Sequence, residues 1–194
     1  MLLPTMPSTA KDTVTPVYMY KWKTVVKHHK PIKNTNIIPW KVPLDSKFAK
    51  FCSKYDNFYN LDGLLASLEA EGKKVKMILD LNQSTIYYNS ALFKPENRKL
   101  ILDRYLKKAT RHDNALEPWR SETFLDVESE FTKDVTYIKA PLSTASLSDD
   151  RSACLKAIFN ELDQYVLHTD PTDDDDQKEV KFDHYILVHC FHGI

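Results

Sequence analysis

The 194-residue sequence has little glycine and little cysteine. It contains only three glycines, well below the usual share of about 7%, so the place of Gly193 within a local motif is informative. Three widely spaced cysteines, Cys52, Cys154 and Cys190, include no Cys-x-x-Cys pair. This spacing argues against a disulfide framework and against a zinc site, and it favours a reducing compartment.

The sequence also lacks an excess of charge and any long apolar run. Its 27 basic and 27 acidic side chains balance, so no overall positive field indicates nucleic-acid binding, and an RNA contact would have to be a local patch. No apolar run approaches the roughly 20 residues of a membrane span, and the start lacks the pattern of a signal peptide. We therefore expect one soluble, intracellular domain that does not associate with membranes.

The first part of the chain combines a polar leader with a basic stretch. Residues 1–17 are rich in Thr, Pro and Ser, which predicts a flexible leader. In residues 18–33, basic side chains alternate with two tyrosines and Trp22, and this pattern suits a ligand with phosphates and bases. The candidate RNA contacts are Lys21, Lys23, Lys27 and Lys30. The alternative is a solvated basic loop with Trp22 in the core, which is the commoner case for a charge run.

Strand and helix patterns that follow one another predict an α/β fold with a central, mostly parallel sheet flanked by helices. Strands are expected at Asn36–Val42, Val75–Leu81, Val135–Ala140 and Phe182–His189. Pro39 confines the first of these to a sheet edge or an irregular position. A helix is expected from Leu61, capped by Asn60 or Asp62 and ended by Gly72.

A second helix is expected from Ser148 or Asp149 onward, with one apolar side made of Leu155, Ile158, Phe159, Leu162 and Val166. Residues 89–134 are interpreted as an insertion between two strands. In it, Pro95 and Glu96 open a helix through Leu100, Ile101, Tyr105 and Leu106 to about Thr110. Trp119, Phe124 and Phe131 are expected to anchor the rest of the insertion. Residues 169–179, with four consecutive aspartates, predict a solvated acidic loop, because adjacent like charges repel and stay hydrated.

The strongest local motif lies in residues 182–194. The apolar run 185–188 leads into His189 and Cys190, and Gly193 follows three residues after the cysteine. This predicts a buried strand that enters a phosphate-binding loop, with Cys190 as a thiolate nucleophile. Backbone amides of Phe191, His192, Gly193 and Ile194 would surround the phosphate. A buried structural cysteine is the alternative, and a metal site is not expected, because His189, Cys190 and His192 lie too close together to complete a tetrahedron.

Residues 189–194 resemble the first six positions of the cysteine-dependent phosphatase pattern His-Cys-x-x-Gly-x-x-Arg, whose arginine would lie two residues beyond Ile194. That arginine would bind two phosphate oxygens and stabilise the transition state. We therefore expect the 194 residues alone to be inactive, to expose apolar surface beside the final strand and to be marginally stable.

Four stretches resemble the cysteine-phosphatase family of RNA 5′-triphosphatases, a group that includes the triphosphatase half of animal mRNA capping enzymes and an RNA-acting atypical dual-specificity phosphatase. The stretches are Ile38 to Leu44, Met77 to Leu81 with Tyr87 and Tyr88, Val135 to Lys139, and Ile186 to Gly193. His192 before Gly193 is typical of this subgroup, and the position of Trp22 also fits. The resemblance implies a dual-specificity-like phosphatase fold over residues 18–194 that lacks its C-terminal helices.

The resemblance further implies metal-independent removal of the γ-phosphate from a 5′-triphosphate RNA end through a phosphocysteine, without a cofactor. Cys190 would be the nucleophile, and His189 would hold the loop and help to activate the thiol. Asp149 and Asp150 lie where a general acid could be sought, although they fit helix caps better. A nuclear location and RNA-processing partners are implied as well. The alternatives are a dual-specificity protein phosphatase and a non-catalytic or truncated binding protein.

Overall fold

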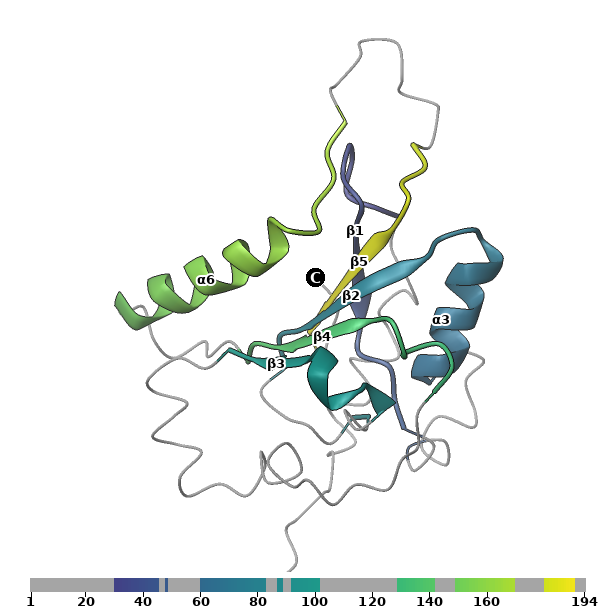
Figure 1. Cartoon of the computed structure of the whole chain (residues 1–194), viewed down its shortest axis with the longest axis horizontal. Coiled ribbons are helices and arrows are strands. Elements are labelled where there is room, and N and C mark those ends of the chain that lie inside the picture. Colours follow the sequence, from purple (N-terminus) through teal and green to yellow (C-terminus); the bar gives the residue numbers. More distant parts are fainter. Residues whose placement is uncertain are drawn as a thin grey trace, which may run out of the picture.

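The computed structural model describes residues 30–45, 48, 60–82, 87–88, 92–101, 129–141, 149–169 and 180–190, and all structural statements refer to these. They form a five-stranded sheet in the order β1-β5-β2-β4-β3, in which every strand pair is parallel (Figure 1). The strands are β1 (Ile37–Lys41), β2 (Val75–Asp80), β3 (Arg98–Leu100), β4 (Thr136–Lys139) and β5 (Tyr185–Cys190). The helices are α3 (Leu61–Ala70), α6 (Asp149–Leu162) and the short 3-10 turn η3 (Pro95–Asn97).

The two long helices pack against opposite faces of the sheet. Leucines of α3 join one buried cluster with Ile78 and Leu187, whereas α6 joins a second cluster with Met77 and Ile186. Neighbouring residues of a strand point to opposite faces, so the two clusters lie on the two sides of β2 and β5. In Figure 1, α3 and α6 accordingly flank the strands from opposite sides. The predicted α/β architecture, with a parallel sheet between helices, is confirmed.

Strand β5 occupies an interior position, as its apolar sequence predicts. It pairs with β1 on one side and β2 on the other, so that Ile186 lies between Ile37 and Met77. Residues 185–189 are buried and Cys190 is partly buried. A strand covered on both faces needs apolar side chains in both directions, which explains the continuous run.

Strand β1 lies at one edge of the sheet and pairs only with β5 among the described strands. It contains Pro39, which has no N–H group for a second neighbour. The edge position predicted from this proline is therefore confirmed.

Helix α3 begins and ends as its sequence predicts. The Asn60 side chain accepts a hydrogen bond from the Gly63 backbone N–H at 2.8 Å, which satisfies a donor that the first turn cannot use internally. Gly72 follows the helix with a φ of 75°, a conformation that favours glycine. The apolar side of the helix is buried and consists of Leu61, Leu64, Leu65 and Leu68. Burial of each leucine contributes about 1.5–3 kcal/mol relative to exposure.

The helix predicted from Pro95 is wrong where the structure describes it. Pro95–Asn97 form only a 3-10 turn, and Arg98–Leu100 continue as β3 at the other edge of the sheet. Leu100 pairs with Lys139, and the Ile101 N–H donates to the Lys139 carbonyl at 2.8 Å. Pairing with β4, which lies far away in sequence, therefore overrides the helical spacing of the apolar residues. The remainder of this predicted helix, with Tyr105, Leu106 and Thr110, lies outside the described residues.

Of the three aromatic anchors predicted in the insertion, only Phe131 is described. Its side chain is 40% exposed, so the expectation that it anchors the segment in the core is wrong. Trp119 and Phe124 lie outside the described residues.

Helix α6 presents a narrower apolar stripe than predicted. Cys154, Ile158 and Leu162 recur every fourth residue and are buried, whereas Phe159 is 57% exposed. Consecutive residues project about 100° apart on a helix, so Phe159 points away from the sheet when Ile158 faces it. Val166, beyond the helix end, packs against the same cluster as expected.

The amino ends of β1 and β5 are joined to the segment after α6 by one buried side chain. Asn36 is fully buried, and its amide donates to the carbonyls of Tyr165 at 2.8 Å and His184 at 3.1 Å. Its side-chain oxygen accepts from the Leu167 N–H at 2.9 Å. Asn36 thus ties three segments together at the amino ends of the strands, opposite the end that carries Cys190.

Within the described residues, no helix is long and apolar enough to cross a membrane.

Candidate active site

The carboxyl ends of four parallel strands bring a group of polar side chains to one edge of the sheet. In register, Asp80 of β2 lies between His189 of β5 and Lys139 of β4, and Lys41 of β1 lies beside Cys190. Parallel neighbours in register share a face, so His189, Asp80 and Lys139 lie on the α3 side. Cys190 and Lys41 lie on the α6 side. Ligands of open α/β sheets bind beyond this edge.

The main chain at His189 and Cys190 is held from both neighbouring strands. The Leu81 N–H donates to the His189 carbonyl at 2.9 Å, and the Val42 N–H donates to the Cys190 carbonyl at 3.2 Å. Both donors lie just beyond the ends of β2 and β1. These bonds fix the direction in which the chain leaves the sheet at Cys190.

Asp80 is the centre of a buried hydrogen-bond network. One carboxylate oxygen, Oδ1, accepts from the backbone N–H of Asn82 at 2.8 Å and from its side-chain amide at 2.9 Å. The other, Oδ2, accepts from the Tyr137 hydroxyl at 2.7 Å and the Lys139 ammonium at 2.9 Å. The Asp80 side chain is 3% exposed and that of Lys139 is 0% exposed. Four donors, one of which is the counter-ion Lys139, therefore compensate for the burial of the carboxylate.

The network keeps Asp80 ionised. Burial by itself raises the pKa of Asp80, but the charge of Lys139, the neighbouring His189 and hydrogen bonds from Lys139 and Tyr137 together lower it below the usual 3.8. Burial lowers the pKa of Lys139 from 10.5, and the attraction of Asp80 opposes this change. We assign a charged pair, because the two groups meet at 2.9 Å. A buried, ionised carboxylate on the α3 face is unsuited to donate a proton beside Cys190 on the other face.

The ring of His189 is fixed at both nitrogens. The Asn82 amide lies 3.2 Å from Nδ1, and the Tyr88 hydroxyl lies 2.9 Å from Nε2. Burial lowers the pKa of His189 from 6.5 to about 4, Asp80 opposes this shift and Lys139 adds to it. The imidazole is therefore neutral near pH 7. His189 is therefore positioned to hold the chain that carries Cys190, and its neutral ring supplies no positive charge there.

Aromatic rings enclose this network on the α3 side. Tyr88 packs edge-on against Tyr137 with ring centroids 6.1 Å apart, and Phe93 stacks on Tyr137 at 4.6 Å. Burial and the charge of Asp80 raise the pKa values of Tyr88 and Tyr137 well above 10. Both side chains remain phenols, so each hydroxyl can donate as well as accept.

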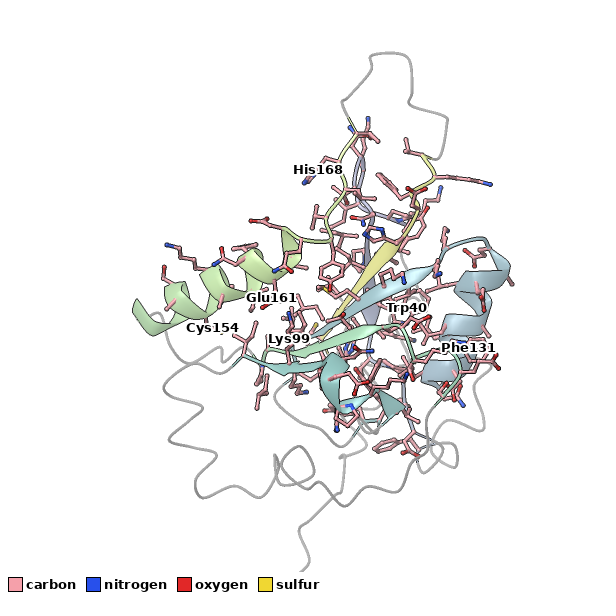
Figure 2. The ribbon with its side chains drawn as sticks, viewed as in Figure 1. Trp40, Lys99, Phe131, Cys154, Glu161 and His168 are labelled. Atoms are coloured by element: carbon pink, nitrogen blue, oxygen red, sulfur yellow. The ribbon has the colours of Figure 1, made fainter. Side chains whose placement is uncertain are left out.

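The thiol of Cys190 is free and partly buried at the end of β5. Lys41, beside it in register, is fully buried and makes interactions of its own. The other described cysteine, Cys154, is buried and belongs to α6, which covers one face of the sheet (Figure 2). Of these two cysteines, Cys190 is the one that ends a strand, at the edge where ligands bind in such sheets.

Several predicted site residues lie outside the described part of the chain. They are Phe191, His192, Gly193 and Ile194 of the loop, Lys21, Lys23 and Lys27 of the basic stretch, Trp22, the leader 1–17 and most of the acidic loop 169–179. Of the proposed RNA contacts, Lys30 alone is described, and it is exposed. Asp149 and Asp150 form the first residues of α6, as expected for a helix start.

No site role was predicted for five members of the network: Asp80, Asn82, Tyr88, Tyr137 and Lys139. Asp80 and Lys139 each end an apolar strand segment, and the ends of parallel strands meet at one edge. A polar residue in that position was the available signal. Tyr88 belongs to a stretch that carries the family resemblance, but nothing in the sequence linked Tyr88 or Asn82 to this network, because their contacts depend on the path of the chain after β2.

A separate cleft of about 470 Å³ lies at the opposite, amino end of the strands, between α3, the start of β2 and the turn before β4. Its lining includes Leu65, Lys74 and the exposed Phe131. Figure 2 shows Phe131 beside α3. No site residue predicted from the sequence lines this cleft. The His-Cys motif lies at the carboxyl edge instead.

Comparison with known proteins does not assign the chain to a family. No family model matches it, and no curated protein matches it. The resemblance to RNA 5′-triphosphatases thus stays a prediction that rests on the residues quoted above.

Proposed function

We propose that this chain carries the nucleophile and supporting core of a cysteine-dependent phosphatase that removes the terminal phosphate from 5′-triphosphate RNA. One observation carries the proposal: Cys190 stands at the carboxyl end of an interior parallel strand, held there by the strands on both sides. Strand ends of this kind feed anion-binding loops in α/β proteins. The sequence after Cys190 provides a glycine at the position where such a loop needs one.

The reaction would proceed by two displacements. The Cys190 thiolate attacks the γ-phosphorus, the bond between that phosphorus and the bridging oxygen breaks, and its electron pair leaves with the diphosphate end of the RNA. Water then attacks the phosphocysteine, which releases inorganic phosphate and regenerates the thiolate. The arginine that would bind the transferred phosphoryl group falls two residues beyond Ile194 in this motif.

The charge arrangement supports a polyphosphate substrate over a phosphoprotein. A diphosphate leaves more readily than an alkoxide or phenolate, so its departure depends less on a general acid. The carboxylate nearest the motif in register, Asp80, is ionised, hydrogen-bonded and on the other face of the sheet. We further propose that the basic stretch containing Lys30 contacts the RNA body, and that the protein acts in the nucleus with RNA-processing partners.

The test is phosphate release from 5′-triphosphate RNA in the presence of a metal chelator. Two chains are compared: the 194 residues, and a chain that continues through Asn-Arg-Thr-Gly and a following helix. We expect the continued chain to turn over, and the shorter chain to be on the order of 100- to 1000-fold slower, the usual effect of losing one transition-state donor.

Matched cysteine variants identify the nucleophile. Cys190→Ala should abolish phosphate release from the continued chain, whereas Cys154→Ala should retain it, because Cys154 lies in α6. A phosphotyrosine peptide serves as the competing substrate. Turnover of the peptide without turnover of the RNA would establish a dual-specificity protein phosphatase instead, and equal turnover in Cys190→Ala would refute the cysteine mechanism.

A further inference from the structure

A chain of directed hydrogen bonds connects the buried carboxylate to the ring of His189. The Asn82 side-chain amide contacts both Asp80 Oδ1 at 2.9 Å and His189 Nδ1 at 3.2 Å. If the amide were turned over, its oxygen would face the Asp80 carboxylate oxygen, and two acceptors would repel each other. Asp80 therefore requires the NH₂ group of Asn82 to point inward, where it can donate to both neighbours.

This orientation decides which nitrogen of His189 carries the proton. A donor at Asn82 requires an acceptor at Nδ1, so the neutral ring carries its hydrogen on Nε2 and donates it to the Tyr88 hydroxyl, 2.9 Å away. The opposite tautomer would direct an N–H from Nδ1 towards Asp80 Oδ1, but that oxygen is 3.8 Å away. This distance is too long for a hydrogen bond.

Asn82 also adjoins the residue that holds the His189 main chain. The Leu81 N–H bonds the His189 carbonyl at 2.9 Å, and the next residue, Asn82, bonds the ring. Residues 81 and 82 thus fix His189 at two points, immediately before Cys190. Asn82 is 5% exposed and His189 is 2% exposed, so water does not compete readily for these groups.

We propose that Asn82 is a positioning residue that locks His189 in the Nε2–H tautomer and thereby orients the chain at Cys190. The tautomer is a property of the fold, and its effect on turnover rests on the function proposed above. Asn82 does not touch the reacting atoms. It acts through His189, with Asp80 setting the direction of its amide and Tyr88 accepting at the far side.

The first part of the test is nuclear magnetic resonance of the ¹⁵N-labelled histidine rings in the 194-residue chain. His189 is identified by the signal that disappears in His189→Gln. We expect a single neutral Nε2–H tautomer at pH 7. Asn82→Leu should produce a mixture of tautomers, and Asn82→Asp should shift the proton to Nδ1 or leave both nitrogens protonated. Asn97→Leu, which removes a surface amide that bonds Lys133, should change nothing at His189. An Nδ1–H tautomer in the unaltered chain would overturn the proposal.

The second part is phosphate release from 5′-triphosphate RNA by the continued chain. Asn82→Leu should lower kcat at least tenfold with little change in KM, because the substrate contacts stay in place while the nucleophile is misdirected. Asn82→Asp keeps the side-chain size, so a lower kcat in this variant as well would result from the changed ring protonation and not from a packing defect. Unchanged kcat in both variants would refute the positioning role. If the unaltered continued chain released no phosphate, the proposed function would fail, while the ring signals would still decide the tautomer.

Discussion

Replacement of Lys139 by methionine tests whether the Asp80 ion pair supports the carboxyl edge of the sheet. Methionine keeps much of the length and volume of the lysine stem but removes the charge. Asp80 would keep its bonds to Asn82 and Tyr137, yet its negative charge would remain buried without a counter-ion. Removal of one partner of a buried pair typically costs about 3–5 kcal/mol of unfolding free energy, and we expect a loss in that range.

A second substitution separates charge from packing. Asp80→Asn, added to Lys139→Met, removes the stranded charge, and its amide oxygen can still accept from Asn82 while the Tyr137 hydroxyl turns to accept. We expect the double variant to recover at least about 2 kcal/mol relative to the sum of the single changes, within the range of coupling energies for contacting residues. Lys99→Met is the matched control. Lys99 is 42% exposed and pairs with Glu161 at 2.6 Å, across the space between β3 and α6 (Figure 2), so its loss should cost less than about 1 kcal/mol.

The assay is urea unfolding at pH 7 and at lower pH. In the unaltered chain the pKa of Asp80 is lowered, so the stability that its ionisation contributes is present above pH 3.8 and is lost as the pH falls through the folded-state pKa. In Lys139→Met burial is no longer opposed by the ammonium, and the pKa of Asp80 should rise. The folded variant would then bind a proton more readily than the unfolded chain. The difference in unfolding free energy between the variant and the unaltered chain should therefore shrink on acidification. A deficit below about 1 kcal/mol at pH 7, or additive single changes, would refute this account.

Three further predictions concern other parts of the fold. Because burial lowers the pKa of His189 from 6.5 to about 4, the unfolded chain binds more protons between these values, and stability should fall by about 1 kcal/mol per pH unit on acidification through this window. His189→Gln should lose that part of the slope, and an unchanged slope in urea titrations would contradict the shift. Asn36→Ala removes the hydrogen bonds to Tyr165, Leu167 and His184 and should lower the free energy of unfolding by about 3 kcal/mol, at roughly 1 kcal/mol for each bond. A calorimetric Tm equal to that of the unaltered chain would show that these bonds do not stabilise the fold. Gly72→Ala places a Cβ at a φ of 75° and should cost about 1 kcal/mol; an Ala variant of equal or greater stability in urea would show that the turn relaxes.

Local chemistry in the sequence predicted much of this fold. The Asn60 cap, the Gly72 stop and the leucine spacing between them are interactions within one helix, and the structure confirms them. The apolar runs of β2 and β5 likewise reflect burial on both faces, and Pro39 indicates the edge.

The errors arose where distant partners decide the outcome. Residues 98–100 have helical spacing, but β4 offers an unpaired edge, and this pairing makes them a strand. Phe159 was assigned to the buried side of its helix, although the actual stripe through Cys154 and Ile158 leaves it exposed. A single apolar residue at a stripe border cannot be placed without knowing the rotation of the helix against the sheet.

In the candidate site, too, the features set by neighbouring residues were predictable and those set by distant residues were not. His189 and Cys190 form a contiguous motif and could be found in the sequence alone. The network below them joins residues more than 50 positions apart, such as Asp80 and Lys139. Parallel strand order is needed to bring these residues together, and only the general rule that strand ends share an edge could have hinted at it.

The interior position of β5 also dictates when this sheet can be completed during synthesis. β1 pairs only with β5 among the described strands, and their partner residues lie about 150 positions apart in the sequence. A ribosome adds roughly 5–20 residues each second, so β1 waits for many seconds with its hydrogen-bonding edge unsatisfied while β2, β3 and β4 are made. Such long-range pairing is slow to form and leaves strand edges open to other chains. Chaperone binding to the nascent β1 segment, or its misassembly with a neighbouring chain, is therefore a vulnerability that follows directly from placing the first strand beside the fifth.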